Sequence, residues 1–237
     1  MFRELLKVSL AVLLGLSSLT ACKNMKAYDV SGTSEGHEYV DLGLSVKWAT
    51  SNVGAETVSE VGGYFAWGET KIKSNCDIES YEYQSDSTTF LKYCCNANWG
   101  KVDNLRVLQP SDDVARSWGG NWRMPSKEEF QELIDKCTWE LKSEGYFDDG
   151  RLRTKNYYKI TGPSGKSLHL PLCGVTQNDQ VLFFDVGLLY WSNTLHEFET
   201  GDPGCANALT VSSGTALVNA MPRTFGMPVR PVLETTE

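Results

Sequence analysis

Residues 121–134 read NWRMPSKEEFQELI and contain a helix start signal. Pro125 prevents an earlier helix from continuing, and Ser126 can act as the N-cap because its hydroxyl can accept a hydrogen bond from a free backbone N–H. Glu129, three residues later, completes a capping box. Apolar residues then recur on one helical face, at Phe130, Leu133, Ile134 and Cys137. The stretch therefore predicts a helix whose entry is fixed by the Trp122–Pro125 junction, and we expect that junction to be structural.

A second short helix is expected immediately before this junction, in residues 108–120, which read LQPSDDVARSWGG. Ser111 or Asp112 can cap its start, acidic residues favour its first turn, and Gly119-Gly120 can end it. The rest of the chain reads as short strands separated by Gly and Pro, including an aromatic strand in residues 63–70, a hairpin in residues 157–171 and a turn in residues 148–150. Two helices among many short strands predict an α+β domain.

The first 22 residues have the features of a bacterial export signal. Arg3 and Lys7 precede a short apolar run, Leu10–Leu16, which is too short to span a bilayer. Leu19-Thr20-Ala21-Cys22 follows and resembles a lipobox, in which the Cys is lipidated and becomes the first residue. We therefore expect an outer-membrane lipoprotein anchored through Cys22, with its periplasmic or external face left open. The alternative is an ordinary signal peptide with a chance Cys.

The expected organisation has one folded domain. Residues 1–21 form the signal peptide, residues 22–36 the lipidated Cys and a polar flexible tether, residues 37–232 the domain, and residues 233–237 a tail. Residues 71–105 show no periodicity and predict a long, partly structured loop.

Charge and cysteine usage limit the partners. A formal net charge of −8 argues against nucleic acid and against electrostatic docking on anionic lipid, since both favour basic surfaces. No CxxC or zinc-type Cys/His spacing occurs. Exported chains often form disulfides, but the pairing stays open, and buried thiols are the alternative. The cysteines concerned are Cys76, Cys94, Cys95, Cys137, Cys173 and Cys205.

Several blocks of the chain resemble a known family. The blocks are EYVDLGLSVKWATSNVGA (38–55), GYFAWGET (63–70), DNLRVLQPSDDVARSWGGNWRMPSKEEFQEL (103–133), LPLCG (170–174), YWSN (190–193) and GMPVRPV (226–232). Together they resemble the Fibrobacter succinogenes major paralogous domain of exported lipoproteins. The WRMPSKEEF block and the terminal VRPV are also similar to the formylglycine-generating enzyme and C-type-lectin-like group.

The second resemblance implies a C-type-lectin-like fold. Such a domain has two short helices, twisted antiparallel strands and long loops, with its N- and C-terminal strands adjacent. It implies that the strand around Tyr39–Asp41 lies beside the strand around Val229–Val232. It also implies structural roles for Arg123 and Arg230.

The resemblance does not carry catalytic or metal chemistry to this chain. Formylglycine-generating enzymes bind copper through two cysteines near the C-terminal end of the domain, where only Cys205 lies here. Calcium-binding lectin motifs are absent, and YWSN lacks the required acid. Common catalytic and phosphate-binding motifs are absent too. We therefore expect no catalytic residue, no metal and no cofactor.

The remaining expectation is a binding function. By fold analogy, ligands would meet the loops after the second helix, which points to Asn193, His196, Glu197 and Asp202. Trp99 is the tryptophan expected to be exposed, whereas Trp48, Trp122 and Trp191 are assigned to the core, and His169 is expected to be half-exposed in a strand. The expected ligand is a glycan or an envelope protein. The alternatives are a diverged formylglycine-generating-type enzyme and a structural or fimbrial-type subunit.

The lipobox makes one direct prediction. Cys22→Ser should release the full-length chain from the membrane fraction of an expressing bacterium, because no thiol remains to be acylated. Ser18→Ala, in the same segment but outside the lipobox, is the matched control and should stay in the membrane fraction. Immunoblots of the fractions measure both, and retention of Cys22→Ser in the membrane would exclude lipid anchoring at this residue.

Overall fold

The structure, a computed structural model, describes residues 29–73 and 75–235. The expected signal peptide and lipidation site Cys22 lie outside this range. Strands make up 39% of the described residues and helices 10%, with one α-helix. The fold is therefore mostly β, and the prediction of an α+β, C-type-lectin-like domain with two helices is wrong. Within the described ranges, no helix is long and apolar enough to cross a membrane.

The elements are short except for two long hairpins. The helical segments are η1 (Ala97–Trp99), η2 (Pro110–Asp112), η3 (Val114–Trp118) and α1 (Lys127–Lys136). The strands are β1 (Gly32–Ser34), β2 (His37–Val40), β3 (Lys47–Ala49), β4 (Gln84–Asp86), β5 (Thr89–Phe90), β6 (Trp122–Arg123), β7 (Thr138–Asp148), β8 (Arg151–Thr161), β9 (Ser167–Pro171), β10 (Val175–Gln177), β11 (Gln180–Leu182), β12 (Leu188–Leu195), β13 (Cys205–Ser212), β14 (Thr215–Pro222) and β15 (Val232–Leu233).

One sheet joins the two ends of the described chain. Its strands are antiparallel, in the order β1-β2-β3-β15-β6. Val232 of β15 pairs with Trp48 on one side and with Arg123 on the other. The sequence predicts the C-terminal strand beside Tyr39–Asp41, but β3 lies between them because the loop after β2 folds β3 back against it. β1 lies within the predicted tether, and Leu233 within the predicted tail.

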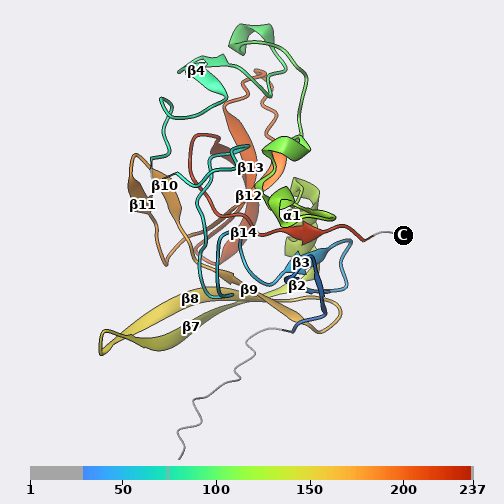
Figure 1. The fold of residues 1–237 in the computed structure, drawn as a ribbon, viewed down its shortest axis with the longest axis vertical. Coiled ribbons are helices and arrows are strands. Elements are labelled where there is room, and N and C mark those ends of the chain that lie inside the picture. The colour runs from blue at the N-terminus through green and yellow to red at the C-terminus, as the bar shows by residue number, and fades with distance from the viewer. Residues whose placement is uncertain (1–28, 74, 236–237) are drawn as a thin grey trace, which may run out of the picture.

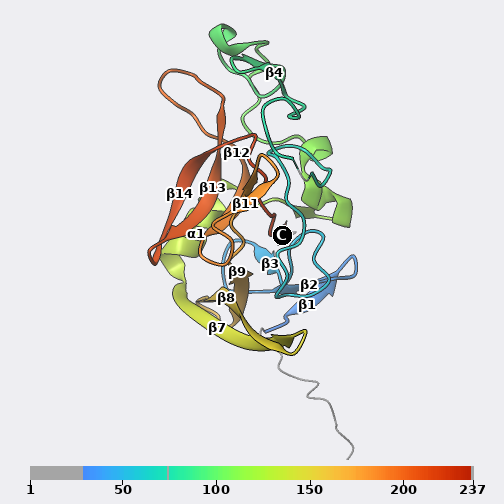
Figure 2. The ribbon, with the colours of Figure 1, turned by 90° about the vertical axis from the view of Figure 1, so that its left-hand side faces the viewer.

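Two three-stranded antiparallel sheets, β7-β8-β9 and β12-β13-β14, make up most of the remaining strand residues. Figure 1 shows the far end of β7 and β8 reaching beyond the other elements, and Figure 2 shows the same ribbon from the side. The hairpin predicted in residues 157–171 is confirmed, with Thr161 paired to Ser167 across its turn. The turn predicted in residues 148–150 is also confirmed, because it connects β7 to β8.

The predicted capping box of α1 is confirmed. The Glu129 N–H donates to Ser126 Oγ at 3.2 Å, and the Ser126 N–H donates to Glu129 Oε2 at 2.8 Å. Phe130 and Leu133 are buried on the core face, where the Phe130 ring lies 5.6 Å from that of Trp48. Local sequence thus begins the helix, and its apolar stripe holds it on the domain.

The other predicted helix is two 3₁₀ segments, η2 and η3. Asp113 separates them in an extended conformation, with φ −99° and ψ 104°. Its carboxylate accepts from the N–H of Ala115 at 2.9 Å and from that of Met124 at 2.9 Å. This long-range contact with Met124 holds Asp113 out of helical geometry, so a continuous α-helix does not form.

Two predictions about single elements are also wrong. Residues 63–70 form an isolated bridge, Phe65 with Met227, instead of a strand, because the Glu69 N–H closes a turn onto the Ala66 carbonyl at 3.0 Å. His169 is 7% exposed rather than half-exposed, since its ring stacks on Tyr157 with centroids 4.5 Å apart.

Two hydrophobic clusters form the core. The first gathers residues from α1, β2, β3, β8, β9, β12 and β15, and the second surrounds Trp67, Trp191 and Met227. Trp48, Trp122 and Trp191 are fully buried, which confirms their assignment to the core. The core therefore depends on aromatic side chains contributed by widely separated segments.

Arg230 is a fully buried cation at the junction of three segments. Its Nε donates to Asn52 Oδ1 at 2.7 Å, its Nη1 to the Ala49 carbonyl at 2.9 Å, and its Nη2 to the His169 carbonyl at 3.1 Å. Burial lowers the pKa of Arg230 to about 10, so the side chain stays charged at neutral pH. Neutral oxygens from the end of β3, the following loop and β9 thus hold this charge.

Arg223 is a second fully buried guanidinium, just after β14. Its carbon lies 5.0–5.8 Å from the ring centroids of Trp67, Tyr81, Phe90 and Tyr93, within cation–π range. Its nitrogens also donate to the Tyr81 hydroxyl at 2.9 Å and to the Lys92 carbonyl at 3.0 Å. These contacts order the long loop, residues 71–105, against the sheet.

Arg230→Met should lower the free energy of unfolding by roughly 3 kcal/mol or more, because three buried acceptors lose their donor. Urea unfolding followed by tryptophan fluorescence measures this. Arg151→Met, at an exposed arginine, is the control and should change stability by less than about 0.5 kcal/mol. Equal losses for both variants would contradict the assigned role of Arg230.

His169 should make stability fall in mild acid. Burial, followed by the charges of Lys159 and Arg230, lowers the pKa of His169 from 6.5 to about 4. In the unfolded chain His169 therefore binds a proton as the pH falls below 6.5, whereas in the folded state it binds this proton only near pH 4. By linkage, stability is lost as pH falls through this window, by up to roughly 3 kcal/mol.

His169→Gln should remove that part of the pH dependence while keeping the backbone carbonyl that Arg230 needs. Urea unfolding at pH 7.0 and pH 4.5 compares the variant with the wild type. His196→Gln serves as the control. An unchanged difference between the two pH values in His169→Gln would show that His169 does not cause the acid sensitivity.

Candidate functional site

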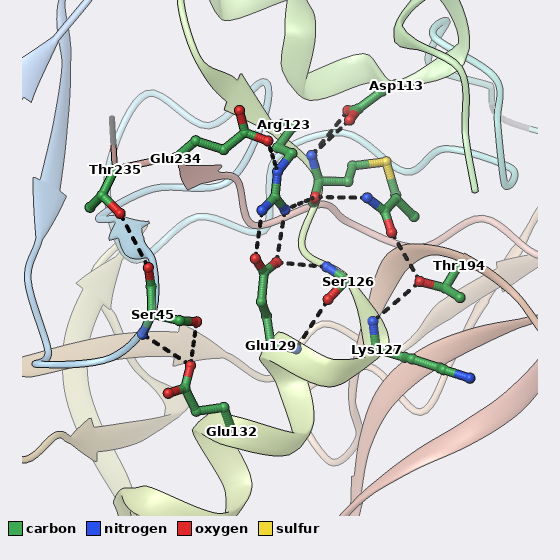
Figure 3. A network of polar contacts seen from close by, with 12 residues as sticks. Ser45, Asp113, Arg123, Ser126, Lys127, Glu129, Glu132, Thr194, Glu234 and Thr235 are labelled. Carbon is green, nitrogen blue, oxygen red and sulfur yellow. Dashed lines mark hydrogen bonds and ion pairs between the residues drawn. The ribbon is translucent and has the colours of Figure 1, made fainter. Parts of the chain in front are cut away.

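The helix junction also builds one wall of a groove, and Figure 3 shows the polar contacts of this junction. Arg123 donates from Nη1 to Glu129 Oε2 at 2.8 Å and from Nη2 to Glu129 Oε1 at 2.5 Å. Its Nε donates to Glu234 Oε1 at 2.6 Å. Burial alone would lower the pKa of Arg123, but hydrogen bonding and charge pairing with Glu129 and then Glu234 raise it. Arg123 is therefore fully engaged within the protein, which agrees with a structural role.

Asp113 lies buried behind this wall. It is 5% exposed and accepts hydrogen bonds from the backbone of Ala115 and Met124. Burial raises the pKa of the Asp113 carboxyl. Its acceptor atoms are used to hold η3 against β6, so it positions the groove.

The first hollow of the groove has a volume of about 480 Å³. It is bounded by η2, η3, the start of α1 and the end of β12. Its lining is strongly charged and polar: Arg106, Val107, Leu108, Pro110, Asp113, Arg116, Arg123, Ser126, Lys127, Glu128, Glu129, Asn193, Thr194, Leu195, Glu197 and Glu234.

Arg116 is the least engaged arginine of this hollow. Its Nη2 lies 4.0 Å from Glu234 Oε1, an oxygen already bound by Arg123. Its Nε is buried and makes no hydrogen bond within the described residues. The Arg116 side chain is 31% exposed and its ion pair with Glu234 is long, so its terminal nitrogens are suited to receive an oxygen from a ligand.

A second hollow adjoins the first and has a volume of about 430 Å³. It is lined by Cys95, Asn96, Ala97, Arg106, Leu195, His196, Glu197, Phe198, Glu199, Gly201, Asp202 and Pro203. Phe198 is 39% exposed and lies edge-on to the His196 ring, with centroids 4.4 Å apart. His196 Nδ1 lies 3.0 Å from Asn207 Oδ1, which fixes the ring orientation. The hollow thus combines an exposed aromatic ring with planar polar groups.

An ion pair between Arg106 and Glu197 contributes to both hollows. The two side chains are 53% and 57% exposed. Exposed pairs contribute little to stability, so this pair can rearrange around a ligand at small cost.

The structure brings most of the sequence-predicted binding residues to this groove. Glu197 lines both hollows, and His196 and Asp202 line the second. Asn193 lines the first hollow but is 8% exposed and donates to the Met124 carbonyl at 3.4 Å, so it supports the wall. Trp99 is half-buried in η1 and lines neither hollow, although its neighbours Asn96 and Ala97 do.

The sequence did not single out several groove residues that could meet a ligand: Arg106, Arg116, Lys127, Phe198 and Glu199. Arg106 and Arg116 lie in the block of residues 103–133. The pattern of this block predicts helix caps and an apolar helix face, but it gives no sign that these two arginines face a groove. Phe198 is separated by one residue from His196 in a loop that the sequence did single out. A local signal for Phe198 therefore existed, whereas Arg106 meets its partner 91 residues away.

The six thiols in the part of the chain that the structure describes show no arrangement for nucleophilic or metal chemistry. Among the described residues all six cysteines are free. Burial raises the pKa of Cys137 to about 11 and that of Cys173 to about 12, and it also raises the pKa of Cys205. A raised pKa leaves little thiolate at neutral pH. Within residues 29–73 and 75–235, no group of three or more His, Cys, Asp or Glu side chains can hold a metal ion.

Comparison with known proteins assigns neither a family nor a function to the chain. The chain matches no family model, no curated protein and no solved structure. The family resemblance of the sequence blocks therefore stays a prediction.

Proposed function

We propose that the chain is an exported, lipid-anchored cell-envelope protein whose domain binds a glycan or a protein without catalysis. The anchor is Cys22, supported by the lipobox-like sequence Leu19–Cys22. Asp29, where the described chain begins, follows Cys22 by seven residues, a span of at most about 25 Å. The tether would keep the domain close to the membrane. Its partners would be the bilayer through the lipid and the ligand through the groove.

The second hollow carries the glycan proposal. The exposed Phe198 ring offers a flat apolar surface for the C–H face of a sugar ring. Asp202 and Glu199 beside it provide carboxylate acceptors for hydroxyl groups. One Asp202 oxygen is held by the Gly204 N–H at 2.8 Å, which orients the carboxylate. An apolar surface with a few oriented polar groups is typical of small-ligand sites.

The first hollow favours a protein as the second candidate. Arg116 Nη2 lies 4.0 Å from its partner Glu234, and Lys127 Nζ lies 3.8 Å from Glu128 Oε1, so both cations are weakly paired there. Figure 3 shows the Lys127 side chain pointing away from the guanidinium of Arg123. These cations suit carboxylates of an acidic peptide segment.

A glycan array tests the proposal. The probe is residues 22–237 with Cys22→Ser, fluorescently labelled and applied with calcium and again with chelator. Specific hits are expected, and Phe198→Ala and Asp202→Asn should each weaken binding at least tenfold, because they remove the stacking surface or an oriented acceptor. Phe183→Ala removes a phenyl ring that is 66% exposed but lines neither hollow, so it should bind normally.

A blank array under both conditions would exclude the glycan. The protein candidate would then be tested with a library of acidic peptides, in which Arg116→Ala should lose binding. Binding unaffected by Phe198→Ala, Asp202→Asn and Arg116→Ala would move the site away from the groove.

A further inference from the structure

β7 is an edge strand with an unusually accessible outer side. Within the described part of the chain it pairs with β8 alone, along all eleven of its residues. β7 and β8 together form a two-stranded hairpin, called the ribbon below. Its far half reaches away from the domain (Figure 1). An edge strand presents unpaired backbone N–H and C=O groups that can pair with another strand.

The hairpin turn determines which residues present these groups. Asp149 and Gly150 have φ values of 48° and 71°, as a type I′ turn requires. In such a two-residue loop the flanking pair, Asp148 with Arg151, exchanges hydrogen bonds. Even-numbered residues of β7 therefore bond to β8. The odd-numbered residues, from Trp139 to Phe147, direct their N–H and C=O groups outward.

One face of the ribbon is apolar beyond the edge of the core. Near the domain this face is buried at Ile160 and Tyr158. Farther out it carries Leu141, Leu152 and Phe147, which are 57%, 68% and 77% exposed. By register Leu141 lies opposite Tyr158, and Phe147 lies opposite Leu152. The core face thus continues as an uncovered apolar surface beside a free strand edge.

We propose that β7 pairs antiparallel with β7 of a second copy of this chain, around a two-fold axis at Ser143. The sheets β7-β8-β9 of the two copies then form one continuous six-stranded sheet. A two-fold axis at Ser143 places an odd-numbered residue at the centre, where both strands direct their free backbone groups toward each other. This proposal does not depend on the ligand of the groove.

Charge complementarity favours this register over the two adjacent ones. With Ser143 opposite itself, Lys142 lies opposite Glu144 of the second copy, and the contact occurs twice. These even-numbered residues occupy non-hydrogen-bonded pairs, in which side chains approach most closely. The neighbouring symmetric registers place Lys142 opposite Lys142, or Glu144 opposite Glu144, and both bring like charges together.

The same register covers the apolar surface. Phe147 lies opposite Trp139 of the second copy, on the same face of the joined sheet. Leu141 lies opposite Gly145, where the missing side chain leaves room. A Cβ at Gly145 would lie 3.3 Å from Leu152 Cδ1, so Leu141 would contact Leu152 there. All three exposed apolar residues on this face of the ribbon gain a partner.

Little has to be broken to form this pairing. Lys142 Nζ contacts Glu140 Oε2 on its own strand at 2.6 Å, and the two side chains are 42% and 46% exposed. Exposed pairs of this kind contribute little, so Lys142 can turn to Glu144 of the second copy. A bilayer would cover the apolar face but would make no use of the charge complementarity between two copies of the strand. The second copy accounts for both.

Analytical ultracentrifugation of residues 22–237 with Cys22→Ser tests the proposal, from about 1 to 200 µM. A concentration-dependent dimer is expected. Lys142→Glu and Glu144→Lys each replace two attractive pairs by two repulsive ones, so each should weaken dimerisation at least tenfold. The double variant restores opposite charges and should dimerise like the wild type. An equimolar mixture of the two single variants should form a heterodimer, although neither dimerises alone.

The positions are exposed, so circular dichroism and thermal unfolding should match the wild type for every variant. A monomer at all concentrations would overturn the proposal. A dimer that ignores both charge reversals, or a mixture that fails to form the heterodimer, would overturn it too. Binding of the monomer to phosphatidylcholine vesicles, lost in Phe147→Ser, would assign the ribbon to the bilayer instead.

Discussion

The buried guanidinium of Arg230 is the constraint on which the rest of the structure depends. Removing such a cation from water costs several kcal/mol unless its donors are satisfied. Here three neutral oxygens satisfy it, from Asn52, Ala49 and His169. Because these acceptors lie on separate segments, the cost is offset only when all three segments are in place. The arrangement therefore couples β3, the following loop and β9 to the C-terminal segment.

That coupling extends to the groove through β15. Arg230 fixes the chain just before β15, and Val232 of β15 pairs with both Trp48 and Arg123. Arg123 in turn holds Glu129 at the start of α1 and Glu234 after β15. The wall of the groove is thus set by partly buried ionic contacts, while the residues free to meet a ligand, such as Arg116 and Phe198, lie on segments held by that wall.

The two surfaces proposed for binding do not compete. None of the residues lining the two hollows belongs to β7 or β8. A dimer built on the β7 edge would therefore leave both grooves open, and two linked sites bind a multivalent ligand more tightly than one. A glycan with repeated units would gain from this arrangement, and a lipid anchor would restrict both copies to the same membrane.

Local signals in the sequence determined the capping box of α1, the turn at Asp149-Gly150 and the hairpin in residues 157–171, because each depends on residues a few positions apart. The groove residues His196, Glu197 and Asp202 came from fold analogy rather than from a local pattern, and they line the groove together because one loop carries them. Only the tertiary structure decided that residues 110–118 form 3₁₀ segments, that β3 separates β2 from β15, and that Arg116 faces the groove. The physical reason is that these features depend on contacts between residues far apart in the sequence. Arg230, for example, donates to the carbonyl of Ala49, 181 residues away, and no local pattern encodes such a contact.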